Sequence, residues 1–142
     1  MCVRLLEKRD IPALAALYKQ FWNEESNISK MEQQFNRLQD NADHIVLIYE
    51  ECGSIVGSVM GVVCPEFYGE CQPFLVIENM IVDRSCRRTG IGCRLLSHLE
   101  ELAKARNCTQ MILVTEKDRL DACGFYEAYG FQTNTTGYKK KL

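Results

Sequence analysis

The chain has 142 residues, of which 46% are hydrophobic and 25% charged, and its formal net charge is −2. This length suits one globular domain, so we expect a single domain over residues 1–142. The composition excludes a disordered or collagen-like chain, and the acidic balance argues against a dedicated nucleic-acid-binding protein.

The first half of the chain predicts a strand, two helices and a hairpin. Alternation in residues 3–8 predicts the strand, and Asp10 is a candidate N-cap for a helix over residues 11–22. A second, more polar helix is expected from Ser29 to about Gln39. Two β-branched runs within residues 44–64 flank a turn at Glu51 to Ser54, which predicts a β-hairpin.

The second half predicts strands that alternate with helices. The longest strand candidate covers residues 74–83, and its alternation puts Glu78, Met80 and Val82 on one face. An amphipathic helix of about sixteen residues begins near Gly90. The remaining elements are a short buried strand, a short helix that ends at Gly130 and a last strand, within residues 110–115, 118–131 and 136–142. This order predicts an α/β fold with a single mixed, mostly antiparallel sheet flanked by helices.

Neither a membrane segment nor a metal site is expected. No apolar run approaches the roughly 20 residues that cross a bilayer, and charge interrupts the first ten residues before a signal-peptide core could form. We therefore expect a cytoplasmic protein with no membrane partner. The eight cysteines form no C-x-x-C pair, and His44 and His98 are not at zinc-ligand spacing. Scattered, buried free thiols are the favoured interpretation of the cysteines.

The segment between the long strand and the following helix predicts an anion site. Glycine at Gly90 and Gly92 lets backbone N–H groups approach a ligand, and the helix N-terminus adds partial positive charge. Four arginines supply full charges around this point: Arg84, Arg87, Arg88 and Arg94. Such a set suits a ligand with several phosphates. The P-loop pattern is absent, and G-x-G-x-x-G would need glycine where Leu95 stands.

Two motifs in this half carry a resemblance to a known family. Residues 82–92, V-D-R-S-C-R-R-T-G-I-G, resemble the [QR]-x-x-G-x-[GA] motif of the GNAT superfamily of acetyl-CoA-dependent N-acetyltransferases, with Arg87, Gly90 and Gly92 at its fixed positions. Residues 119–131, R-L-D-A-C-G-F-Y-E-A-Y-G-F, resemble the later motif of that family. The resemblance covers essentially the whole chain, although the N-terminal half matches only in element order. It implies a GNAT-like fold and acetyl transfer from acetyl-CoA to a primary amine by direct attack in a ternary complex.

The resemblance also implies where the donor would bind. Backbone amides of the loop would hold the CoA pyrophosphate, and the strand edge at Met80, Ile81 and Val82 would pair with the pantetheine arm. The loop residues so implicated are Arg87, Arg88, Thr89, Gly90, Ile91, Gly92 and Cys93. Many family members have asparagine where this chain has Arg119, so its task is either a phosphate or pantetheine contact or that of a surface cation.

Two residues are candidates for proton transfer. The family often places a carboxylate nine residues before the motif's arginine, as Glu78 stands before Arg87, where it deprotonates the incoming ammonium directly or through water. Tyr126 matches the family tyrosine that protonates the departing CoA thiolate. The structural alternatives are that Glu78 pairs with an arginine or caps a sheet edge, and that Tyr126 is a core aromatic residue.

The acceptor is expected to be a small cationic amine. In this family the first two helices and the loop between the third and fourth strands set acceptor specificity. The stretches to inspect are W-N-E-E-S-N, residues 22–27, and P-E-F-Y-G-E-C-Q, residues 65–72. They contain no basic residue and several acidic and aromatic ones: Trp22, Glu24, Glu25, Glu66, Phe67, Tyr68 and Glu70. Charge pairing and cation–π contacts would bind a cation there, whereas ordinary solvated loops are the structural alternative.

Several alternatives stay open at this stage. A peptide, a protein N-terminus or a lysine could be the acceptor, and the chain could form a homodimer. The alternative of another class is a non-catalytic acyl-CoA-binding sensor or regulatory module. A sensor needs only the loop, so the presence of both Glu78 and Tyr126 favours the enzyme.

Overall fold

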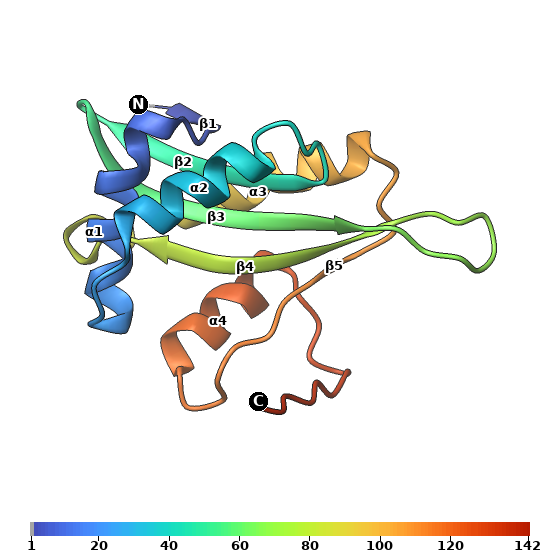
Figure 1. Ribbon diagram of the computed structural model, residues 1–142. Coiled ribbons are helices and arrows are strands. Elements are labelled where there is room, and N and C mark those ends of the chain that lie inside the picture. The colour runs from blue at the N-terminus through green and yellow to red at the C-terminus, as the bar shows by residue number, and fades with distance from the viewer. Residues whose placement is uncertain (1) are drawn as a thin grey trace. The chain divides into compact units, whose positions relative to one another are not determined.

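The computed structural model describes residues 2–142 (Figure 1). The described chain divides into two compact units, of which the first ends at Ile112 and the second is Leu113–Leu142. The first unit contains one five-stranded sheet and three α-helices, and the second contains one helix, α4 (Leu120–Tyr129).

The sheet is mixed and mostly antiparallel, as the sequence predicts. Its strands lie in chain order: β1 (Cys2–Leu5), β2 (His44–Glu51), β3 (Ser54–Cys64), β4 (Phe74–Val82) and β5 (Met111–Ile112). The first four strands pair antiparallel, and β5 pairs parallel to β4. The predicted β-hairpin is confirmed, because β2 and β3 meet across a tight turn at residues 52–53. Valine and isoleucine dominate these strands, as expected for residues that pack well on a pleated surface.

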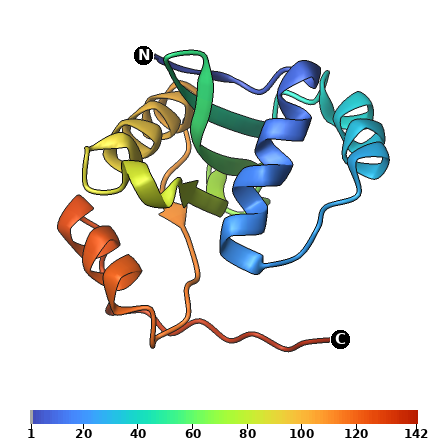
Figure 2. The same cartoon turned by 90° about the vertical axis from the view of Figure 1, so that its left-hand side faces the viewer.

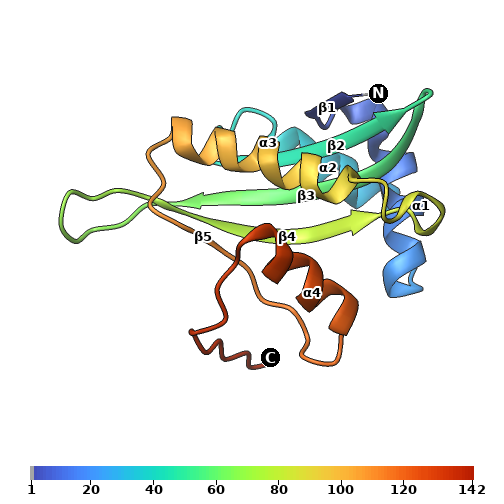
Figure 3. The ribbon, with the colours of Figure 1, turned by 180° about the vertical axis from the view of Figure 1, so that it is seen from behind.

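Helices cover both faces of the sheet. Seen along the sheet, α1 (Ile11–Trp22) and α2 (Ile28–Leu38) lie on one side, and α3 (Ile91–Ala105) lies on the other (Figures 2 and 3). The amphipathic patterns bury Leu14 and Leu17 of α1, and they bury Leu95, Leu96 and Leu99 of α3. Gly61 of β3 permits the close approach of α3, because a Cβ there would lie 2.7 Å from Leu99 Cδ1.

The helix starts differ from the predicted ones. Asp10 precedes α1 as expected, but its side chain does not cap that helix, because a short 3₁₀ turn (Lys8–Asp10) comes first. Its carboxylate accepts instead from the Glu7 backbone N–H at 2.8 Å. Helix α2 begins one residue earlier than predicted, because the Asn27 side chain is its cap and accepts from the Lys30 N–H at 3.0 Å.

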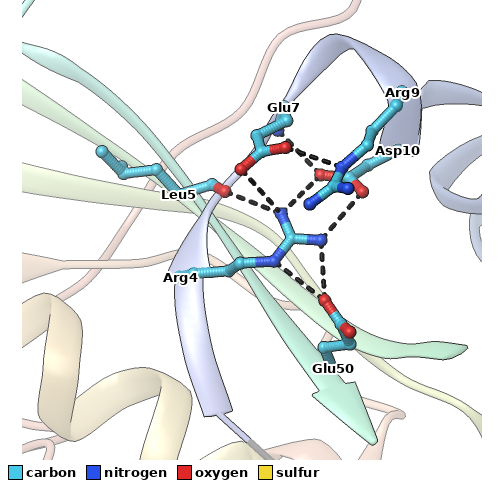
Figure 4. A network of polar contacts seen from close by, with 6 residues as sticks. All are labelled: Arg4, Leu5, Glu7, Arg9, Asp10 and Glu50. Atoms are coloured by element: carbon cyan, nitrogen blue, oxygen red, sulfur yellow. Dashed lines mark hydrogen bonds and ion pairs between the residues drawn. The ribbon is translucent and has the colours of Figure 1, made fainter. Parts of the chain in front are cut away.

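A network of ion pairs joins β1, the 3₁₀ turn and β2 (Figure 4). The Arg4 guanidinium binds both carboxylate oxygens of Asp10, at 2.7 and 2.9 Å, and it also binds Glu50 at 2.8 and 2.9 Å. Asp10 is 5% exposed. The hydrogen bonds from Arg4 hold the pKa of Asp10 below its usual range. The network therefore fixes the chain where it passes from the first strand into α1.

The C-terminal third departs most from the prediction. Strand β5 has only two residues, although residues 110–115 predict a strand. The last strand, predicted over residues 136–142, is not formed in the described chain, where these residues have no regular structure. The helix is confirmed as α4, and it ends at Gly130, which has a φ of 120°.

The cysteines are free, but the expectation that they are buried is wrong. Four are exposed and four are half-buried. Most belong to turns, loops and helix starts rather than to the core: Cys52 and Cys71, for example, have positive φ angles of 50° and 54°.

Candidate functional site

The loop between β4 and α3 has a well-defined local conformation. A 3₁₀ turn (Arg84–Cys86) follows β4, and Asp83 caps it by accepting from the Ser85 N–H at 2.8 Å. The Thr89 hydroxyl donates to the Cys86 carbonyl at 2.6 Å. Arg88 and Gly90 have φ angles of 64° and 86°. Left-handed residues next to extended or helical ones turn successive backbone N–H groups toward one side, which is how anion-binding nests form.

The N-terminus of α3 is suited to an anion. The first N–H groups of a helix have no partner within it, and a capping side chain or an acidic first turn commonly satisfies them. Here the cap residue is Gly90, at which the described residues make no side-chain cap, and the first turn has no acidic residue. A Cβ built at Gly90 meets no atom within 4 Å. The predicted glycine therefore faces open space at a helix N-terminus without a side-chain cap, the kind of position at which anions commonly bind in proteins.

The three arginines of the loop and Arg94 of α3 do not form one ring of charges. Arg84 donates to the Gln20 backbone carbonyl at 2.5 Å, and Arg94 donates to the Tyr49 hydroxyl at 2.8 Å. Arg87 bends back to the Val82 carbonyl, with 3.3 Å between Nε and the oxygen. Two of the expected phosphate-binding cations are therefore engaged with α1 and β2.

Strand β4 has an open edge beyond its first residues. It pairs with β3 along its length, but with β5 only at Leu75 and Val76. From Ile77 to Val82, the other edge has no partner strand among residues 2–142. This edge contains Met80, Ile81 and Val82, the residues expected to pair with an extended ligand. Unpaired backbone groups on a strand edge are the usual template for such pairing.

A β-bulge changes the faces on which the β4 side chains lie. Asn79 has a φ of 50°, and the pairing shifts there, so that two residues of β4 stand opposite one of β3. Glu78 lies opposite Met60, whereas Val82 lies opposite Gly57. Gly57 faces Ile91 and Leu95 of α3. The predicted common face for Glu78 and Val82 is therefore wrong: the exposed Glu78 lies on the α1 side of the sheet, and Val82 on the α3 side.

The other two predicted site residues belong to the second unit. Arg119 immediately precedes α4, and Tyr126 is half-buried within this helix. The Tyr126 ring contacts Phe125 and Phe131 edge to face, with ring centroids 5.2 and 5.8 Å apart. This cluster fixes the ring within its unit. Such packing is also expected under the alternative interpretation, in which Tyr126 is only a core aromatic residue.

The two segments expected to bind the acceptor do not lie together. Gln20, near the end of α1, contacts Asp83 at the C-terminal end of β4. The loop with Glu66 and Glu70 precedes the N-terminal end of the same nine-residue strand. A strand of that length spans about 30 Å. Figure 1 shows the two segments at opposite ends of the sheet, so they do not form one entrance.

One contact of the loop has no signal in the sequence. The Gln20 side chain donates to Asp83 Oδ2 at 2.7 Å, although the two residues are 63 positions apart. Both line a cavity of about 500 Å³ between α1, the β2–β3 turn and β1. Of the residues in the two sequence motifs, only Asp83 lines this cavity. The other charged or hydroxyl-bearing lining residues are Arg4, Arg9, Asp10, Glu50 and Ser54.

The described residues show neither a metal-binding cluster nor a membrane-spanning helix. Within residues 2–142, His, Cys, Asp and Glu side chains form no group of three or more that could hold a metal ion. None of the helices in this described part of the chain has both the length and the apolar character needed to cross a bilayer.

Comparison with known proteins identifies the family. The model of the acetyltransferase (GNAT) family matches residues 11–131. YhfO of Bacillus subtilis, described as an uncharacterised N-acetyltransferase, is 26% identical over 139 residues, which are 95% of this chain and 92% of that protein. A glucosamine 6-phosphate N-acetyltransferase of Trypanosoma brucei brucei is 32% identical over 89 residues, which are 63% of this chain and 58% of that protein.

The fold is also that of solved structures. Glucosamine-6-phosphate N-acetyltransferase from Arabidopsis thaliana superposes with a TM-score of 0.89 at 22% identity, covering 99% of this chain and 97% of that one. The family match extends from the start of α1 to Phe131, two residues beyond α4, and it includes both motifs on which the sequence resemblance rests. The chain therefore belongs to the acetyltransferase (GNAT) family.

Proposed function

We propose that this N-acetyltransferase moves an acetyl group from acetyl-CoA to a primary amine by direct attack in a ternary complex. The observation that carries the donor half is the N-terminus of α3, where a left-handed glycine borders open space and no side chain caps the helix. Members of the family use acetyl-CoA, and its pyrophosphate matches the chemistry of this site. In this proposal the amides of residues 87–93 hold the pyrophosphate, with Arg87 and Arg88 adding charge.

The open edge of β4 supports the proposed place of the pantetheine arm. Its amide groups can form hydrogen bonds along Met80, Ile81 and Val82, and one N–H in this segment would face the thioester carbonyl. A preorganised N–H that stabilises a tetrahedral oxyanion typically contributes about 3–4 kcal/mol. Arg119 is proposed as a further contact to the donor.

Two side chains are proposed to move protons. Glu78 is exposed on the α1 side of the sheet, where an incoming ammonium can reach it, and it removes a proton directly or through water. The amine nitrogen then attacks the thioester carbon and gives its surplus proton to solvent, and the C–S bond breaks as the tetrahedral intermediate collapses. Tyr126 gives its proton to the leaving thiolate, a role that suits a phenol beside a developing anion.

The acceptor is proposed to bind on the α1 side, near Glu78 and the acidic linker after Trp22. The names of relatives point to amines on sugars, since two curated relatives are glucosamine 6-phosphate N-acetyltransferases. The acidic residues of the linker favour a cation instead, and a peptide amine also remains a candidate. Glu66 and Glu70 lie at the other end of β4, so they are not part of this proposed acceptor site.

An acceptor screen tests the proposed activity. Thiol release from acetyl-CoA should be measured with polyamines, aminoglycosides, amino acids, glucosamine 6-phosphate and basic peptides. We expect one class to raise the rate of thiol release well above that without amine, with the acetylated amine detected by mass spectrometry. Tight CoA binding without thiol release for any amine would favour the sensor alternative.

A variant of Gly90 tests the donor site. Gly90→Val should weaken CoA binding at least about tenfold, because the side chain fills the space proposed for the phosphates and strains a residue with a φ of 86°. Calorimetry measures the affinity. Gly53→Val is the matched control, since Gly53 also has a positive φ, 79°, and open space around its Cβ. It should cost similar stability and leave CoA binding unchanged.

CoA binding should also be visible as an increase in the stability of the folded protein. Saturating CoA, at a hundredfold excess over the dissociation constant, should stabilise the wild-type fold by about 2.7 kcal/mol. It should not raise the melting temperature of Gly90→Val by the same amount. Equal CoA affinity in wild type and Gly90→Val would contradict the assigned donor site.

A further inference from the structure

The start of the β4–α3 loop is attached to the last turn of α1 by three hydrogen bonds. Gln20 Nε2 donates to Asp83 Oδ2 at 2.7 Å, and Gln20 Oε1 accepts from the Arg84 backbone N–H at 3.3 Å. The Arg84 guanidinium donates to the Gln20 backbone carbonyl at 2.5 Å. One residue of α1 therefore binds two consecutive residues of the loop through both its side chain and its backbone. We call Gln20, Asp83 and Arg84 the clamp.

Each contact in the clamp satisfies a group that would otherwise need water. The Gln20 carbonyl belongs to the last turn of α1, where carbonyl groups have no partner within the helix and carry the negative end of the helix dipole. A guanidinium is a suitable partner for both reasons. The Asp83 carboxylate also accepts from the Ser85 N–H and hydroxyl, at 2.8 and 2.6 Å. The hydrogen bonds from Ser85 and Gln20 hold the pKa of Asp83 below its usual range, so it is an anion at neutral pH.

The clamp acts on the residues that precede the anion-binding amides. Asp83 also receives the Cys86 N–H on its carbonyl at 3.0 Å, and Cys86 in turn receives the Thr89 hydroxyl at 2.6 Å. A continuous series of hydrogen bonds thus runs from Gln20 to the residue before Gly90. Preorganised donors bind an anion more tightly than mobile ones, because less conformational entropy is lost on binding.

We propose that Gln20 is a positioning residue of the donor site, which holds the β4–α3 loop in its anion-binding conformation before CoA arrives. This proposal rests on the proposed function of the loop. Gln20 does not need to touch CoA for this role, since it acts through Asp83 and Arg84. Its side chain borders the cavity rather than the core, so its replacement can be accommodated without disrupting the packing of α1.

Substituting Gln20 tests the proposal through CoA affinity, which needs no knowledge of the acceptor. Gln20→Leu keeps the approximate size of the side chain and removes its hydrogen bonds, one of them to a charged group. We expect the dissociation constant for CoA, measured by calorimetry, to rise about tenfold. Ala13→Leu is the matched control: it changes another residue of α1 on the same cavity wall, makes no change to the clamp and should bind CoA as the wild type does.

A second variant separates positioning from general damage to the fold. Gln20→Glu places a carboxylate against Asp83 at neutral pH, but at lower pH a proton shared by the two carboxyl groups restores a donor between them. The CoA affinity of this variant relative to wild type should therefore recover as the pH falls from 8 to 5.5, and that of Gln20→Leu should not. The charged groups around this pair are Arg84 and Arg87 of the loop and, across the cavity, Arg4, Arg9, Asp10 and Glu50.

The outcomes distinguish this inference from the proposed function. If the wild type does not bind CoA, or Gly90→Val binds it equally well, the donor site itself is wrong. If both of those tests succeed but Gln20→Leu binds CoA with wild-type affinity, only the role of Gln20 is refuted. A loss of CoA affinity in Gln20→Glu that does not change with pH would also refute the role of Gln20.

Discussion

Asp10→Asn is expected to lower the free energy of unfolding by about 3–5 kcal/mol, the usual cost of breaking a buried ion pair by removing one charge. Asp10 is 5% exposed, and its two carboxylate oxygens receive Arg4 in a bidentate pair. The substitution leaves the half-buried Arg4 guanidinium with Glu50, at 2.8 Å, and the more distant Glu7, at 4.0 Å, as its anionic partners. Urea denaturation at pH 7 measures the loss. Glu25→Gln is the control, because its exposed pair with Lys19 should contribute less than about 1 kcal/mol.

The stabilisation from Asp10 should also depend on pH in one direction. The pKa of Asp10 is lower in the folded state than in the unfolded state, so its contribution is complete above the unfolded value, near 3.9, and is lost as the pH falls through the folded value. The difference in stability between wild type and Asp10→Asn should therefore shrink below about pH 4. A difference that is constant from pH 7 to pH 3 would show that packing, and not charge, is responsible.

A double-mutant cycle separates the pair from the rest of the network. Arg4→Leu should be destabilising alone, since it leaves Asp10 charged, buried and without its main partner. Combining Arg4→Leu with Asp10→Asn should cost much less than the sum of the two single changes, because neither charge is then left unpaired. Additive effects would show that Arg4 and Asp10 do not stabilise the fold through each other.

The parts of the fold that are encoded locally could be predicted from the sequence. The bounds of α1 follow from its apolar spacing, and the β2–β3 turn follows from a glycine between two β-branched runs. The start of α3 next to Gly90 follows from the motif and from the apolar spacing after it. In each case, the residues that decide the structure are neighbours in the chain, so their pattern is visible in the sequence.

The features that depend on distant residues could not be predicted. The alternation in β4 gives the wrong face for Val82, because the bulge at Asn79 adds a residue, and an asparagine within an apolar strand is a weak signal of a bulge. Arg84 and Arg94 look like phosphate ligands in the sequence, yet they bind Gln20 and Tyr49, 64 and 45 residues away. Residues 136–142 contain strand formers without a strand, because strands need partners as well as propensity.

The largest kinetic effect is expected at Tyr126. Tyr126→Phe should lower kcat about a hundredfold or more, the usual contribution of a general acid, while the dissociation constant for CoA stays unchanged. The substitution removes only the hydroxyl group and keeps the ring contacts with Phe125 and Phe131. Tyr129→Phe is the matched control on the same helix, where the ring also contacts Phe131, and it should keep wild-type turnover. A loss in both variants would indicate damage to the aromatic cluster rather than loss of an acid.

Glu78→Gln tests the other proposed proton transfer, the removal of a proton from the acceptor amine. The amine must lose a proton before its nitrogen can attack, so the variant should lose most activity at low pH, where the amine is mostly protonated, and least at high pH, where free amine is abundant. The rate should be measured from pH 6 to pH 9 with the acceptor found in the screen. Glu66→Gln changes a carboxylate at the far end of β4 and should follow the wild-type profile. If Tyr126→Phe and Glu78→Gln both turn over at the wild-type rate across this range, neither residue transfers a proton, and catalysis must rest on the binding and orientation of the two substrates alone.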